Sequence, residues 1–251
     1  SSLYRLQTIE QKIETVMQRC TTLEQRLNAL ETRDIITPAP IPHTTKQWCL
    51  DNTQKHACPS LVKEDPDLFL IYNNRAAFGE WTNTNTARML FDSDEHGFSA
   101  DAFTVRCCSM PSLAVVIFTD DNDAFGGFIS VPVNQLNERL PDPDHFLFAL
   151  QTHGRCVTPQ KFPLTQAVQD KNTVGFDLKD KKCLVEFGIW NMFFLNCGEP
   201  DSPSSNYNLS EGYEGLDDDD LTGSSGKRFG KSFSCRRIVV LSFSLNRTHP
   251  R

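Results

Sequence analysis

The 251-residue chain lacks an apolar run of the roughly 20 residues that a membrane-spanning helix requires. It also lacks the paired-cysteine framework of small secreted domains, because its nine cysteines are an odd number scattered along the sequence. Several of them lie inside apolar runs, as Cys183 does, and such cysteines are typical of buried, reduced thiols. This usage favours a cytoplasmic location, with the nucleus as the alternative.

Basic residues are in the minority, since 25 Lys and Arg stand against 32 Asp and Glu, for a net charge of −7. An acidic chain repels a polyanion on average, which argues against general nucleic-acid binding. One local basic cluster qualifies this argument. It consists of Lys227, Arg228, Lys231, Arg236 and Arg237.

Complete motifs for catalysis or metal binding are missing as well. Ser225–Ser232 approaches a phosphate-binding loop, but its first glycine is absent and an apolar strand follows instead of a helix. Cys49, His56 and Cys58 cluster without a C-x-x-C pair or a clear fourth zinc ligand. Asp121–Gly126 begins like a calcium loop, but a hairpin turn explains it better because strands are expected on both sides. We therefore expect no catalytic residue set, no metal and no cofactor.

The vicinal pair Cys107 and Cys108 is the remaining candidate for chemistry. These cysteines end a predicted helix, whereas a thiolate is stabilised at a helix N-terminus or beside a cation. We expect a packed thiol at Cys107 and a half-exposed one at Cys108, and a thiol-based redox enzyme is kept as an alternative.

What the chain does have is an uninterrupted heptad repeat over residues 3–34. Apolar residues recur in alternating steps of three and four, with Leu6, Ile13, Cys20 and Leu27 at a positions and Ile9, Val16, Leu23 and Leu30 at d positions. The g positions are all basic, and most e positions are acidic, so a parallel pair of helices brings opposite charges together. We predict a parallel coiled coil over residues 1–34 that forms a dimer or a tetramer. The alternative is a single amphipathic helix packed on the rest of the chain.

The remaining sequence divides into a linker, a globular domain and a tail. Residues 35–46 contain alternate prolines, which hold a backbone extended, and we expect a semi-rigid linker there. The globular domain is expected over 47–246 and a tail over 247–251. Within the domain, the Gly-, Ser-, Asn- and Asp-rich stretch 198–232 predicts a mobile excursion.

Strands outnumber helices in the pattern of the globular domain. Strands are predicted near 113–119, 125–132, 145–150, 183–189, 191–196 and 236–245, a further short one at Leu68–Tyr72, and helices near 99–108 and 132–140. The hairpin-like spacing indicates antiparallel pairing. The predicted fold class is α+β, mainly β: a two-sheet antiparallel β-sandwich flanked by short helices.

An ordered series of short motifs lies between residues 91 and 150. Ser99 can cap a helix whose Phe103 and Cys107 share one face, and buried strands follow. This order resembles the TLDc domain family, most clearly over 88–150. Its helix segment is matched by Gly97, Phe98, Ser99, Phe103 and Cys107, its F-G-G-F strand by the pair Gly126 and Gly127, and its F-L-F-x-L strand by Phe146 and Phe148. Because these residues include no reactive combination, we expect their role to be structural.

The resemblance also has functional implications. It implies the same β-sandwich and a non-enzymatic protein-interaction module, linked to oxidative-stress response and to binding or regulating the vacuolar proton-pumping ATPase (V-ATPase). The chain departs from the family pattern at Thr104, Val133 and Ser242, where His, Trp and an acidic residue are common. The alternative functions are a nucleic-acid-binding or transcription-associated regulator that uses the basic cluster 227–237, and the thiol-based enzyme.

Overall fold

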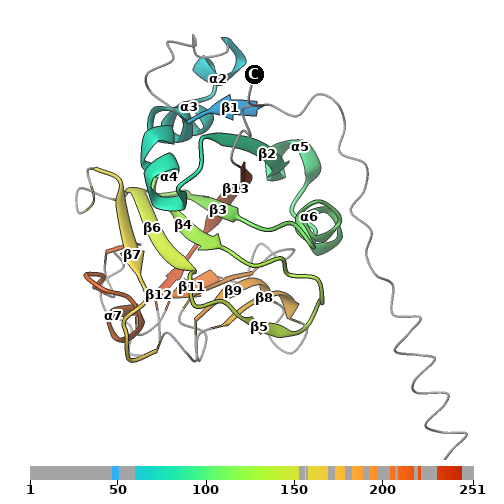
Figure 1. Cartoon of the computed structure of the whole chain (residues 1–251). Helices are drawn as coiled ribbons and strands as arrows, with labels where there is room; N and C mark the ends of the chain where they lie inside the picture. The colour runs from blue at the N-terminus through green and yellow to red at the C-terminus, as the bar shows by residue number, and fades with distance from the viewer. Residues whose placement is uncertain are drawn as a thin grey trace, which may run out of the picture. The chain divides into compact units, whose positions relative to one another are not determined.

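Two antiparallel β-sheets packed face to face form the main part of the described structure (Figure 1). The computed structural model describes residues 47–50, 60–152, 156, 158–168, 173–178, 183–188, 193–196, 204–206, 209–217, 220–221 and 231–244. The predicted coiled coil at 1–34, the linker at 35–46 and the tail at 247–251 lie outside these residues. The predicted fold class, an α+β and mainly β sandwich with short helices, is confirmed.

The first sheet contains seven strands in the order β1-β2-β13-β3-β4-β6-β7. Its strands are β1 (Gln47–Cys49), β2 (Thr86–Asp92), β13 (Cys235–Ser244), β3 (Leu113–Thr119), β4 (Ala124–Ile129), β6 (Phe146–Gln151) and β7 (Gln160–Pro163). The late strand β13 lies between β2 and β3, so residues more than a hundred positions apart pair side by side.

The second sheet contains six strands in the order β12-β11-β10-β9-β8-β5. They are β12 (Lys231–Phe233), β11 (Ser204–Asn206), β10 (Phe193–Asn196), β9 (Cys183–Phe187), β8 (Thr173–Leu178) and β5 (Arg139–Pro141). The described helices are short: α2 (Ser60–Lys63), α3 (Pro66–Asn73), α4 (Arg75–Thr82), α5 (Ser93–His96), α6 (Ala100–Cys107) and α7 (Leu209–Gly212). None of them is long and apolar enough to cross a membrane.

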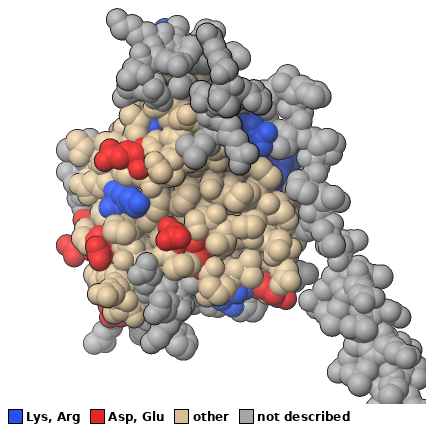
Figure 2. Space-filling model, in the orientation of Figure 1, with Lys and Arg blue, Asp and Glu red and all other residues tan. Residues whose placement is uncertain are grey.

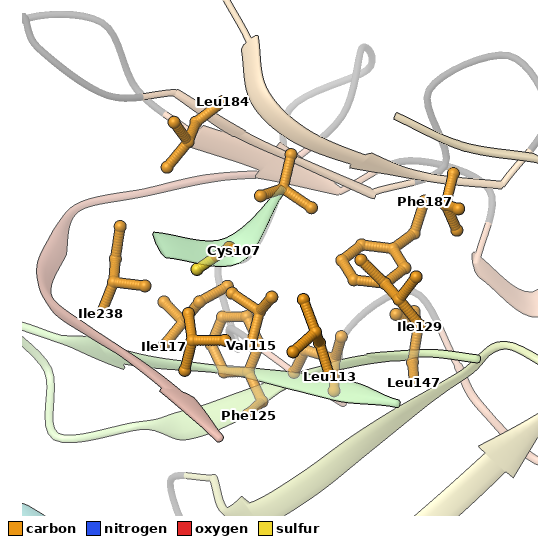
Figure 3. Packing of buried hydrophobic residues seen from close by; sticks show 14 of the residues in the cluster. Cys107, Leu113, Val115, Ile117, Phe125, Ile129, Leu147, Leu184, Phe187 and Ile238 are labelled. Atoms are coloured by element: carbon orange, nitrogen blue, oxygen red, sulfur yellow. The ribbon is translucent and has the colours of Figure 1, made fainter. Parts of the chain in front are cut away.

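The first sheet is buried on both faces, which explains the continuous apolar sequence of β3. Leu113, Val115 and Ile117 point into the core between the sheets, where Figure 3 shows them opposite Leu184 and Phe187. The alternate residues of β3 belong to a second core, which they share with residues of α3 and α4. Both faces therefore require apolar side chains, and no polar alternation is left in the strand.

Most predicted elements are confirmed. The strand predicted at 113–119 matches β3, the other five long strands agree with β4, β6, β9, β10 and β13 to within three residues at each end, and the helix predicted at 99–108 is α6. These are the segments whose local sequence has a strong apolar or capping signal.

Two predicted elements are wrong. The strand predicted at Leu68–Tyr72 is part of helix α3, because Asp65 accepts hydrogen bonds from the amides of Asp67 (3.1 Å) and Leu68 (3.0 Å) and Pro66 occupies the first helical turn. The helix predicted at 132–140 does not form. There, the Ser109 amide donates to the Val133 carbonyl (2.8 Å), and residues 139–141 pair with β8 as strand β5.

Of the stretch 198–232, predicted to be a mobile excursion, the structure describes residues 204–206, 209–217, 220–221 and 231–232. Strand β11 and helix α7 lie inside this stretch. The side chains of Leu209, Tyr213, Leu216 and Leu221 are buried in the core between the sheets. These described parts therefore contribute side chains to the core of the sandwich.

Candidate functional site

The residues of the predicted helix signature hold the two sheets together at one end of the sandwich. Phe103 of α6 is fully buried, and its ring meets Phe91 of β2 (centroids 5.4 Å apart) and Phe176 of β8 (5.2 Å) edge to face. The Ser99 hydroxyl accepts a hydrogen bond from the Ala102 amide (3.1 Å) and so caps α6. Cys107 is fully buried beside them, while Gly97 has a positive φ of 79°. Phe98 is half-buried against the same core.

The glycine pair of β4 occupies two positions where a side chain does not fit. A Cβ atom on Gly126 would lie 1.8 Å from the carbonyl oxygen of Val115, in the neighbouring strand. A Cβ atom on Gly127 would lie 2.5 Å from the ring of Phe187, which reaches across from the second sheet. Close approach of backbone and of an opposing ring therefore explains both glycines.

Phe146 and Phe148 of β6 point to the other face of the first sheet, where they pack under α4. The Trp81 ring lies 6.3 Å from Phe146 and 5.9 Å from Phe148, and Phe78 meets Phe148 edge to face at 5.3 Å. Aromatic pairs at such distances stabilise a fold by more than the hydrophobic effect of their buried area alone.

The vicinal thiols of Cys107 and Cys108 are both buried. Burial raises the pKa of Cys107 far above its usual range, and the positive charge of Arg106 opposes this only weakly. The prediction of a half-exposed Cys108 is wrong, because this side chain is fully buried and its thiol donates to the Val133 carbonyl (3.0 Å). Burial also raises the pKa of Cys108. Because the thiolate is the reactive form, neither cysteine is prepared for nucleophilic or redox chemistry.

Six charged side chains form an arginine–aspartate cluster: Asp65, Asp67, Asp92, Asp94, Arg236 and Arg237. At its centre, the Arg237 guanidinium donates to both oxygens of Asp92 (3.0 and 2.6 Å) and to both oxygens of Asp65 (2.9 and 2.8 Å). Arg236 makes a two-pronged bond to Asp67, with both distances at 2.9 Å. The cluster ties the start of α3 to strands β2 and β13.

Electrostatics in the cluster follow from burial and pairing. Burial alone would lower the pKa of Arg237, but the hydrogen bonds to Asp92 and Asp65 raise it well above its usual range. Burial pushes the pKa of Asp65 upwards, yet the Leu68 amide and Arg237 together bring it below its usual value. The partly exposed Asp94 has a raised pKa, because burial and the neighbouring aspartates outweigh Arg237.

Two members of the basic cluster at 227–237 are paired with carboxylates in this arrangement. The guanidinium groups of Arg236 and Arg237 are held by carboxylates and do not form a free basic surface. Lys227 and Arg228 lie outside the described residues, as does the side chain of Lys231. On the face drawn in Figure 2, the described Lys and Arg side chains are few and are interspersed with Asp and Glu.

A second buried polar group joins the β5–β6 turn to the stretch after α7. The His145 ring lies with Nδ1 2.7 Å from the Asp142 carbonyl oxygen and Nε2 3.0 Å from the Tyr213 hydroxyl. The Asp142 carboxylate accepts from the amide (2.8 Å) and the hydroxyl (2.5 Å) of Ser130. Ser130, Asp142, His145 and Tyr213 are thus linked by a chain of hydrogen bonds. Such a chain stabilises the contact between the turn and the stretch after α7.

A third polar contact, an ion pair, lies within the second sheet. Glu186 of β9 is buried and accepts two hydrogen bonds from Arg139 of β5 (2.9 and 3.0 Å). The two residues are register partners of Gly175 in β8, so Arg139 reaches its partner across a glycine.

Sequence reasoning did not find these networks. Arg237 and Asp65 are 172 positions apart, and His145 and Tyr213 are 68 apart, which no local pattern reveals. Among the residues with described positions, no group of three or more His, Cys, Asp and Glu side chains is placed to hold a metal ion.

Comparison with models of protein families identifies a match. The family model for the TLDc domain matches residues 65–190, just over half of the 251-residue chain. No curated protein sequence matches the chain.

Proposed function

This chain belongs to the TLDc family, and we propose that it is a non-enzymatic protein-interaction module which a parallel coiled coil presents in several copies. The observation that carries the proposal is the TLDc match over residues 65–190. It is supported by the vicinal thiols of Cys107 and Cys108, whose pKa values burial raises, and by the buried charged groups Arg139–Glu186 and Arg237–Asp92, which are paired with each other. A fold alone does not define a function, so the proposal needs a direct binding test.

The family suggests a partner and a process. We propose that the partner is a subunit of the V-ATPase, that binding serves the oxidative-stress response, and that it takes place in the cytoplasm. The heptad repeat at 3–34 supports presentation in several copies. Linking binding modules raises overall affinity by about 10²- to 10⁴-fold where the sites can be engaged together.

The test is capture of purified V-ATPase by the intact chain and by a seam variant, Ile13→Asp with Leu27→Asp. Both replaced residues are at a positions, so charges there disrupt the coiled coil without touching the described domain. Gln25→Asp, at an outward f position of the same helix, is the matched control. We expect capture by the intact chain and the control, and at least about tenfold weaker capture by the seam variant.

Two outcomes would contradict the proposal. Equal capture by all three proteins would remove any role for the coil, and absence of capture by the intact chain would remove the V-ATPase as the partner. The alternatives have their own tests: salt-dependent binding to duplex DNA for the nucleic-acid regulator, and fast alkylation of a thiol at neutral pH for the redox enzyme.

A further inference from the structure

Residues 209–217, which we call the strap, run along the end of strand β7. The strap contains α7 and continues through Tyr213 to Leu216. Its backbone is hydrogen-bonded to the sandwich in two places: the Glu214 amide donates to the Pro163 carbonyl (2.8 Å), and the Thr165 amide donates to the Gly212 carbonyl (2.9 Å). Such edge contacts are the kind of local structure that opens at a lower free energy than a central strand.

One side chain anchors the strap in the core. Tyr213 is 1% exposed, and its hydroxyl bonds to Nε2 of His145, which is also 1% exposed. The other ring nitrogen, Nδ1, faces the Asp142 carbonyl, which can only accept. We therefore assign the ring proton to Nδ1, so that Nε2 of the neutral ring accepts from the Tyr213 hydroxyl.

Protonation of the His145 ring removes the acceptor of the Tyr213 hydroxyl. Nε2 then becomes a second donor, and the Tyr213 hydroxyl has to turn round to accept from it. Its own proton is left without an acceptor, because in the described structure the hydroxyl bonds to His145 alone. A buried unpaired polar group and a buried charge both cost free energy in the closed state.

The surroundings offer little compensation for a positive ring. Strand β9 contributes the apolar Phe187, whose ring centre is 6.0 Å away, and the strap contributes Tyr213. The turn that carries His145 contributes the Asp142 carboxylate, which is already held by Ser130 and by the Asp144 amide. From β7, Lys161 places its ammonium over the Phe146 ring (4.2 Å). Burial consequently lowers the pKa of His145, although the carbonyl and the charge of Asp142 act in the opposite direction.

We propose that His145 is an acid-operated latch: protonation of its ring releases the strap from the sandwich and uncovers the edge of β7. In the released state His145 is hydrated and regains its ordinary basicity. Because the closed state binds the proton more weakly, the latch holds fully above about pH 6.5 and is lost as the pH falls below that value. This inference rests on the fold and is independent of the proposed partner.

Hydrogen exchange of the intact chain tests the latch. After correction for the intrinsic rate, we expect the opening of residues 209–217 to increase by up to about tenfold for each pH unit below 6.5. The amides of β3, at the centre of the first sheet, should stay protected over the same range. Parallel opening of β3 and the strap would mean global acid unfolding and would overturn the proposal, as would a strap whose opening does not depend on pH.

Two variants sharpen the test. His145→Gln keeps an acceptor for Tyr213 but cannot be protonated, so the acid-dependent opening of the strap should vanish. His96→Gln is the matched control, because His96 is a half-buried histidine that bonds only to the backbone of Asp92, and this variant should behave like the original chain. Unchanged acid dependence in His145→Gln would overturn the latch. Should that variant fail to fold, the NMR titration of His145 in the original chain must share its midpoint with strap opening, and different midpoints would overturn it.

Discussion

At the scale of single residues, the family signature is explained by packing. The two glycines of β4 admit a carbonyl on one face of the strand and a phenyl ring on the other. Phe103 fills the space between one strand of each sheet. Protein interiors are packed as densely as organic crystals, so even a small change of side-chain volume at these positions should lower the stability of the fold.

Replacement of the glycines should destabilise the domain unequally. Gly127→Ala meets a ring that can shift, and we expect a loss of about 1–3 kcal/mol in the free energy of unfolding. Gly126→Ala meets the backbone oxygen of Val115, which cannot move away without distorting β3, so its loss should be larger. Urea unfolding measures both. Phe187→Leu should partly rescue Gly127→Ala and leave Gly126→Ala unchanged, and rescue of both variants would contradict the packing assignment.

Arg237 should be the most important charged residue for stability. Arg237→Met leaves Asp92 buried and without its partner, and removing one side of a buried ion pair costs about 3–5 kcal/mol. Arg236→Met is the matched control, since its side chain is 40% exposed and such pairs contribute about 0–1 kcal/mol. Chemical unfolding of both variants compares the two values. Similar losses would show that Arg237 has no special place in the cluster.

At the scale of helices and strands, local sequence signals act where they are strong. Helix α6 begins at Ala100 because Ser99 caps it, and the cap is exposed to solvent. Ser99→Ala should therefore lower the free energy of unfolding by about 1 kcal/mol. Ser99→Asp keeps an acceptor for the Ala102 amide and adds a negative charge at the helix start, so it should cost much less. Thermal unfolding distinguishes the two, and equal losses would contradict a capping role.

The same elements show what the sequence can and cannot predict. Strand β3 is predictable because both its faces are buried and its sequence is apolar throughout. Helix α3 differs from the predicted strand because its apolar run Leu68–Tyr72 favours a strand, whereas the capping residue Asp65 and Pro66 before it start a helix. Strand β5 differs from the predicted helix because its conformation depends on pairing with β8, which lies further along the chain. The buried networks of Arg237 and His145 depend on still longer separations and leave no local trace.

At the scale of the whole molecule, the described domain and the heptad repeat suggest different tasks. The domain has buried, paired polar groups and two apolar cores, which suit a stable fold. The repeat at 3–34 has an apolar seam with segregated charges, which suits association of several chains. Under the proposed function, association of several chains is therefore part of how the protein binds its partner.

The mass of the intact chain in solution tests this central claim most directly. Sedimentation equilibrium at micromolar concentration should give twice or four times the 28.4 kDa of one chain. The seam variant Ile13→Asp with Leu27→Asp should give the mass of one chain, and the Gln25→Asp control should retain the higher mass. A single-chain mass for the intact protein would contradict the account.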